Sequence, residues 1–203
     1  MRRLLLALSV ALVCGTQDVA VPRPMEDLDA PKVAGTWYTV AMAASNPALL
    51  GAPLRLYVQE LKPTAQGDLE IMVRGRWGAR WCVEKKILAE RTESAGEFNV
   101  NYPVVDRLVV LDTDYENFLF ACLESSAAPE QIRACQYLAR TPKVDRAAME
   151  QFERALKLLS VHIHVILTPR QAQERASCAS LGCGSYALLT PHSSLLQDQR
   201  KTA

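Results

Sequence analysis

The sequence lacks a strong charge of either sign. Lysine and arginine together number 23 and aspartate and glutamate 22, so the formal net charge is +1. This balance gives no electrostatic reason to expect nucleic acid or an anionic membrane surface as a partner. The composition shows no bias toward a residue class, no internal repeat is visible, and no glycine loop of the phosphate-binding type is present. With 203 residues, the chain is long enough for one domain, or at most two small ones.

Long hydrophobic runs are also lacking, except at the start of the chain. Arg2 and Arg3 precede the apolar run Leu4–Val13, and small residues follow it. This arrangement is typical of a secretory signal peptide and is too short to span a membrane. We therefore predict a signal peptide over residues 1–20, cleaved between 15 and 20, and a soluble, secreted, extracellular product with no membrane partner.

N-glycosylation motifs are absent from the sequence. Asn46, Asn99, Asn101 and Asn117 are each followed by residues that do not complete Asn-x-Ser/Thr. A heavily N-glycosylated protein that acts through its glycans is therefore disfavoured.

Cysteine is present in an odd number once the signal peptide is removed. Of the six cysteines, Cys14 leaves with the signal, so five remain. A secreted protein can form disulfides, and two bridges with one spare thiol is the default expectation. Spacing alone does not fix the pairing.

Short alternating segments fill most of the chain between the signal peptide and residue 140. Alternation of apolar and polar residues indicates half-buried strands, and no helical pattern lies between them. The class is therefore all-β, an antiparallel sandwich or barrel. The predicted strands are Trp37–Ala43, Leu54–Leu61, Leu69–Val73, Cys82–Leu88, Glu97–Tyr102, Leu108–Asp112, Asn117–Leu123 and Ala134–Arg140.

The pattern changes after Pro142. Apolar residues recur at helical spacing, which predicts an amphipathic helix over about residues 145–158 with Asp145 as its N-cap. Val161–Leu167 alternates again and is predicted to be a ninth, outer strand. Residues 179–203 are rich in serine and glycine and are predicted to form an atypical, disordered C-terminal tail.

Three motifs occur in the order in which lipocalins present theirs. They are Gly35-Thr36-Trp37-Tyr38, then Thr113-Asp114-Tyr115, and Arg140 after the last strand of the series. On these residues the sequence resembles the lipocalin family, with a lipocalin domain over residues 21–178. The resemblance implies an eight-stranded antiparallel up-and-down barrel with one flanking α-helix and a ninth outer strand. In that family the residue at Trp37 plugs the closed end of the barrel and that at Arg140 packs across it. Gly35 lets the backbone pass close to the ring.

The same resemblance implies a binding function. A barrel of this size can hold one elongated apolar ligand, such as a retinoid or a long-chain fatty acid. Lys85 and Arg76 are expected at the mouth, where a cation would pair with a ligand carboxylate. Ala121 falls where relatives carry a bulkier residue. The residues expected to line the cavity are Leu54, Leu56, Val58, Leu69, Ile71, Val73, Ile87, Val100, Leu108, Val110, Leu119 and Leu123.

The resemblance also carries expectations for pairing. We predict disulfides Cys122–Cys135 and Cys82–Cys178, with Cys183 able to compete for Cys82. The outer strand at Val161–Leu167 would be an edge strand. We therefore predict a homodimer that forms through this strand.

Catalysis and metal binding find little support. Lipocalin enzymes of the prostaglandin-synthase type use a cysteine on an early strand, and no cysteine lies between Cys14 and Cys82. His162 and His164 share a strand face, but two ligands make a poor metal site. We therefore expect no enzyme, no metal and no cofactor, and predict a milk or secretory carrier protein. A secreted signalling or immunomodulatory protein that acts through its surface is the alternative, and a nutritional or vestigial protein is a third.

Overall fold

The computed structural model describes residues 22–46, 57–77, 81–102, 105–125, 132–159, 161 and 163–172. Side chains are described within these ranges except at positions 76, 77, 81–83, 163 and 164. The predictions for the signal peptide and the C-terminal tail lie outside these residues. So do those for Leu54, Leu56 and Cys178.

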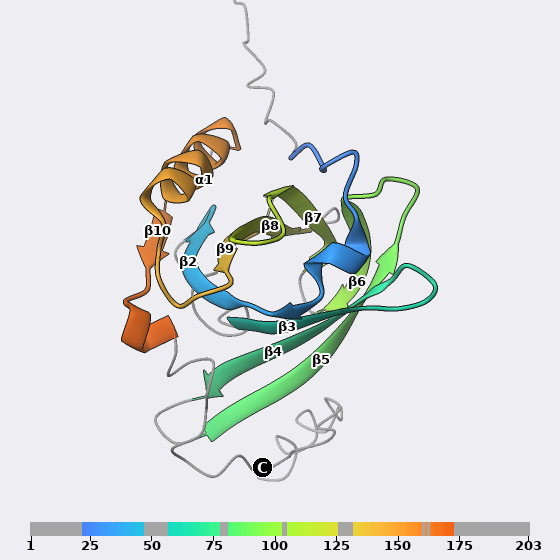
Figure 1. The fold of residues 1–203 in the computed structure, drawn as a ribbon, viewed down its shortest axis with the longest axis horizontal. Helices are drawn as coiled ribbons and strands as arrows, with labels where there is room; N and C mark the ends of the chain where they lie inside the picture. Colours follow the sequence, from blue (N-terminus) through green and yellow to red (C-terminus); the bar gives the residue numbers. More distant parts are fainter. Residues whose placement is uncertain are drawn as a thin grey trace, which may run out of the picture.

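In the part of the chain that the structure describes, ten antiparallel strands form a single sheet in the order β1-β3-β4-β5-β6-β7-β8-β9-β2-β10. The strands follow one another around a ring, and each of the nine predicted strand segments corresponds to a strand of the structure (Figure 1). The elements are η1 (Ala30–Val33), β1 (Gly35–Thr36), β2 (Tyr38–Ala44), β3 (Tyr57–Pro63), β4 (Leu69–Trp77), β5 (Trp81–Arg91), β6 (Glu97–Tyr102), β7 (Val105–Thr113), β8 (Phe118–Glu124), β9 (Arg133–Ala139), α1 (Arg146–Leu158) and β10 (Ile163–Ile166).

One interrupted strand closes the ring. β1 pairs with β3, whereas β2, which follows it directly in the chain, pairs with β9. Across the interruption, the backbone N–H of Trp37 donates to the carbonyl of Gln59 at 2.9 Å. The two halves of this interrupted strand therefore connect β3 to β9 and close the sheet into a barrel. The predicted up-and-down barrel is confirmed.

Helix α1 lies outside the barrel, beside β2 and β10 (Figure 1). Its predicted N-cap is confirmed, because the Asp145 carboxylate accepts from the N–H of Ala148 at 2.9 Å. The apolar face of the helix buries Phe152, whose ring centroid lies 5.2 Å from that of Phe120 on β8. Complete burial of such a side chain contributes about 1.5–3 kcal/mol. The predicted Cys122–Cys135 disulfide is also confirmed and joins β8 to β9 in the same outer layer.

A row of charged residues crosses the outer face of the barrel wall from β6 to β9. Arg107 pairs with Glu97 at 3.1 Å and with Glu124 at 2.5 Å. Glu124 also pairs with Arg133, and both of these side chains are buried. Arg133 Nη1 donates to the carbonyl of Leu159 at the end of α1, at 2.6 Å. The buried charges satisfy one another, so this row fastens the helix end to the barrel wall.

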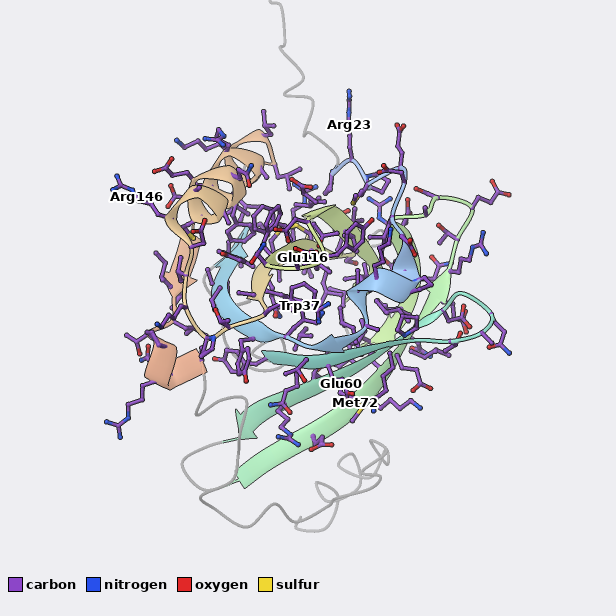
Figure 2. The ribbon with its side chains drawn as sticks, in the orientation of Figure 1. Arg23, Trp37, Glu60, Met72, Glu116 and Arg146 are labelled. Carbon is purple, nitrogen blue, oxygen red and sulfur yellow. A yellow bond between two sulfur atoms is a disulfide. The ribbon has the colours of Figure 1, made fainter. Side chains whose placement is uncertain are left out.

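The barrel is closed at one end by Trp37, which is fully buried and central in the ring of strands (Figure 2). Its indole Nε1 donates to the carbonyl of Val33 in η1 at 2.8 Å. The Arg140 guanidinium lies 3.7 Å from the ring centroid and donates to the carbonyls of Ala34 and Thr36. Gly35 has φ +103°, and a Cβ there would come within 3.3 Å of Arg140 Nη1. Only glycine fits here without strain.

The turn between β7 and β8 completes the closed end. Tyr115, at φ 66°, accepts from Arg140 Nε through its carbonyl. Asp114 Oδ1 accepts from the N–H groups of Asn117 and Phe118, and its Oδ2 accepts from the Asn117 side-chain amide. Burial alone would raise the pKa of Asp114, but these hydrogen bonds outweigh it and hold the pKa below its usual value.

Within the part of the chain that the structure describes, no helix is long and apolar enough to cross a bilayer.

Replacing Asp114 by Asn should lower the free energy of unfolding at neutral pH by about 1 kcal/mol, because an amide oxygen is a weaker acceptor than a carboxylate. The folded-state pKa lies below the usual 3.8, so the stabilisation is complete above that pH. It is lost as the pH falls through the folded-state pKa. Urea unfolding at a series of pH values should show the difference between the two proteins shrinking in acid. Asp112→Asn, at an exposed carboxylate on β7, is the control. A difference that stays constant into strong acid would contradict the role given to Asp114.

Candidate ligand-binding site

The interior of the barrel is a continuous apolar cluster that begins at Trp37. It forms because inward residues alternate with outward ones on every strand. On β4, for example, Ile71 is buried inside, whereas Met72 lies on the outer side (Figure 2). The predicted lining residues that the structure describes all belong to this cluster. They are Val58, Leu69, Ile71, Val73, Ile87, Val100, Leu108, Val110, Leu119 and Leu123.

Other side chains of the cluster extend this lining beyond the predicted set. Phe98 and Ala89 face the same interior from β6 and β5, and Leu138 faces it from β9. Ala121 packs against the cluster from β8 between Leu119 and Leu123, as strand alternation requires. Its small side chain leaves more room at this level than a bulkier residue would.

Lys85 lies on the inward row of β5. It follows the described buried residues of that row toward the β4–β5 turn. Ala89 and Ile87 are buried, and Lys85, two residues further along, is exposed. The end of β5 near Arg91 is tied to the closed end, where the Arg91 N–H donates to Asp68. At about 3.3 Å per residue, Lys85 lies roughly 20 Å from Arg91 along the strand. It therefore lies at the end of the apolar interior opposite to Trp37.

Tyr102, on the neighbouring strand β6, contacts Lys85 diagonally across the β5–β6 pair. The Lys85 Nζ is 4.7 Å from the centroid of the Tyr102 ring, and the half-buried ring packs against the interior cluster. Burial raises the pKa of the Tyr102 phenol above its usual 10.0. Tyr102 was not among the predicted lining residues. However, the alternation of Phe98, Val100 and Tyr102 placed it on the inward row.

Some predicted residues lie at or outside the limits of what the structure describes. Arg76 and Cys82 are opposite each other in the β4–β5 ladder, but only their backbones are described. The mouth role of Arg76 and the Cys82–Cys178 bridge therefore remain predictions. Among the described residues, no group of three histidine, cysteine or acidic side chains could hold a metal ion.

A depression of about 490 Å³ lies at the closed end of the barrel. It is bordered by the N-terminal arm and by the turn between β5 and β6, including the charged residues Asp27, Asp29, Arg91 and Glu93. Its lining also includes Leu28 and Phe98, which belong to the interior cluster as well. It is therefore a second place where a small molecule could bind, at the end of the interior opposite to Lys85.

The chain matches the model of the lipocalin / cytosolic fatty-acid binding protein family over residues 34–173. This match spans most of the barrel, the helix and β10. The chain belongs to the lipocalin family. Its fold is that of a family of carriers and binding proteins for small hydrophobic ligands, and its interior is apolar.

Curated relatives narrow the comparison within the lipocalins. The chain is 51% identical to beta-lactoglobulin-2 of Canis lupus familiaris over 160 residues, covering 77% of this chain and 98% of that protein. It is 46% identical to beta-lactoglobulin-2 of Equus caballus over 180 residues, which cover 86% of this chain and 98% of that protein. It is 45% identical to human glycodelin over 174 residues, which cover 84% of this chain and 96% of glycodelin.

A solved structure supports the fold independently. An odorant-binding protein, OBP1, superposes with a TM-score of 0.63 at 16% sequence identity, covering 71% of this chain and 96% of that one. At this identity the likeness concerns the barrel fold and not the ligand.

Proposed function

We propose that the protein is a secreted, non-catalytic carrier of small hydrophobic molecules such as retinoids or long-chain fatty acids. The observation that carries this proposal is the apolar interior that runs from the buried Trp37 to the exposed Lys85. An elongated apolar molecule with a polar end matches this arrangement, with its chain inside and its polar end at the lysine.

The main driving force is desolvation of the ligand chain. Burial of apolar surface contributes on the order of 25 cal/mol per Å², which favours any ligand that fills the interior. A carboxylate at the mouth would add a charge-assisted hydrogen bond to the Lys85 ammonium. Because Lys85 is exposed, this contact should orient the ligand more than it strengthens binding, since exposed ion pairs are worth about 0–1 kcal/mol.

Secretion and the absence of catalysis are part of the proposal. The hydrophobic N-terminal segment and the disulfide between Cys122 and Cys135 support export to an oxidising compartment. Similarity to beta-lactoglobulin-2 and glycodelin supports the carrier class. The early-strand cysteine that lipocalin enzymes of the prostaglandin-synthase type use has no counterpart here, since residues 15–81 contain no cysteine.

Binding inside the barrel predicts that Ile71→Glu abolishes binding of both palmitate and retinol, because an unpaired charge in the apolar interior costs several kcal/mol. Met72→Glu, on the outer side of the same strand, is the matched control and should bind normally. Ala121→Phe fills part of the interior without adding a charge. It should weaken the binding of both ligands while the fold is kept. Fluorescence titration with retinol and calorimetry with palmitate would measure these affinities. If both Ile71→Glu and Ala121→Phe bind like the parent, ligands occupy another site.

The mouth contact should be ligand-selective. Lys85→Met should lower the affinity for palmitate about fivefold or less, because it removes one partly solvated ion pair. The affinity for retinol should be nearly unchanged. Lys86→Met is the matched control, because the Lys86 side chain pairs with Glu70 on the outer face. An equal loss for both ligands in Lys85→Met would argue against a carboxylate contact.

We also propose a homodimer through β10. Within the described residues β10 is the last strand of the sheet, and its Val165 and Ile166 are 46% and 49% exposed. An edge strand with exposed apolar residues can pair through its outer side with its counterpart in a second copy around a twofold axis.

The register of β10 shows which substitution tests this dimer. Leu167 N–H donates to the carbonyl of Val40 on β2, so by antiparallel alternation the N–H of Ile166 points to the free edge. Ile166→Pro should therefore block strand addition without removing a hydrogen bond to β2, and analytical ultracentrifugation should show a monomer. Leu158→Lys, at an exposed apolar residue of α1, is the control. A dimer that persists in Ile166→Pro would mean that another surface is used.

A further inference from the structure

Lys85 and Tyr102 lie on two neighbouring inward rows of the barrel, at the end of the interior away from Trp37. Strands β5 and β6 pair Ala89 with Val100, and both of these residues are buried in the interior. On β5 the inward row continues from Ala89 through Ile87 to Lys85. On β6 it continues from Val100 to Tyr102. The two side chains therefore meet where the apolar lining gives way to solvent.

The contact between them leaves the lysine able to bind a ligand. The Lys85 Nζ lies 4.7 Å from the Tyr102 ring centroid, within the range of a cation–π interaction. An ammonium carries three N–H donors, and the ring covers only one side of it. Because Lys85 is exposed, a carboxylate can approach from the other side while the ring contact is kept.

The ring itself is fixed by its surroundings. Tyr102 pairs with Val105 at the start of β7, and Val105 is buried in the interior cluster, as is part of the Tyr102 ring. Burial also keeps the phenol protonated, since it raises the pKa above the usual value. Tyr102 therefore brings no negative charge to compete with the head group of a ligand.

We propose that Tyr102 is a specificity-determining residue of the barrel: its ring holds the Lys85 ammonium at the mouth, ready to bind the anionic head group of an amphiphile. This inference rests on the carrier function proposed above. A free lysine side chain loses much rotamer freedom when it is fixed on a ligand, and a lysine already held over a ring loses less. The ring therefore raises affinity for ligands with a carboxylate and leaves neutral ligands unaffected.

The test compares palmitate with retinol in Tyr102→Leu and Tyr102→Phe. Loss of the ring in Tyr102→Leu should lower the ratio of palmitate affinity to retinol affinity about two- to fivefold, the range expected for an exposed cation–π contact. Tyr102→Phe keeps the ring and should keep the ratio. In a Lys85→Met background, Tyr102→Leu should change the ratio no further, because the cation is already gone.

The possible results separate this inference from the carrier function. An unchanged or increased ratio in Tyr102→Leu, with retinol still bound, overturns the role of Tyr102 and leaves the carrier function intact. A reduced ratio in Tyr102→Phe also overturns it, since the hydroxyl and not the ring would then matter. Failure of the unaltered protein to bind either ligand overturns the carrier function and this inference with it.

Discussion

The barrel depends on the bend at Trp37 that divides its first strand into β1 and β2. Because β1 pairs with β3 and β2 with β9, this segment joins β3 to β9 and closes the ring of strands. The bend is held by Arg140, which covers the Trp37 ring and donates to the carbonyls on both sides of Gly35. These contacts cover one end of the apolar interior.

Much of this arrangement could be predicted from the sequence, because alternation along a strand decides which side chains face inward. The lining residues from Leu69 to Leu123 followed from that rule together with the lipocalin resemblance. The helix followed from apolar residues at helical spacing, and Asp145 from its position as N-cap. Strand ends were less predictable. β4 continues beyond Val73 to Trp77, although Arg74 and Gly75 interrupt the apolar pattern, since backbone hydrogen bonding to β5 does not depend on side-chain type.

Contacts between strands could not be predicted in the same way. Alternation places Lys85 and Tyr102 on inward rows, but their proximity depends on the register of β5 against β6. The buried pair of Glu124 and Arg133 is a second case. Arg133 lies just before the predicted strand, and nothing in the sequence indicates that the end of α1 covers it. Such pairs are set by the tertiary structure and not by local pattern.

The central claim is that the barrel interior, with Lys85 at the end opposite to Trp37, is the ligand site. A crystal structure with a fatty acid brominated on its chain tests this most directly, because bromine is located by its anomalous scattering. If ligands bind there, bromine will lie inside the barrel among Ile71, Val100 and Val110, with the carboxylate next to the Lys85 ammonium. Bromine in the depression at the closed end, or between α1 and the barrel wall, with an empty interior, would contradict it.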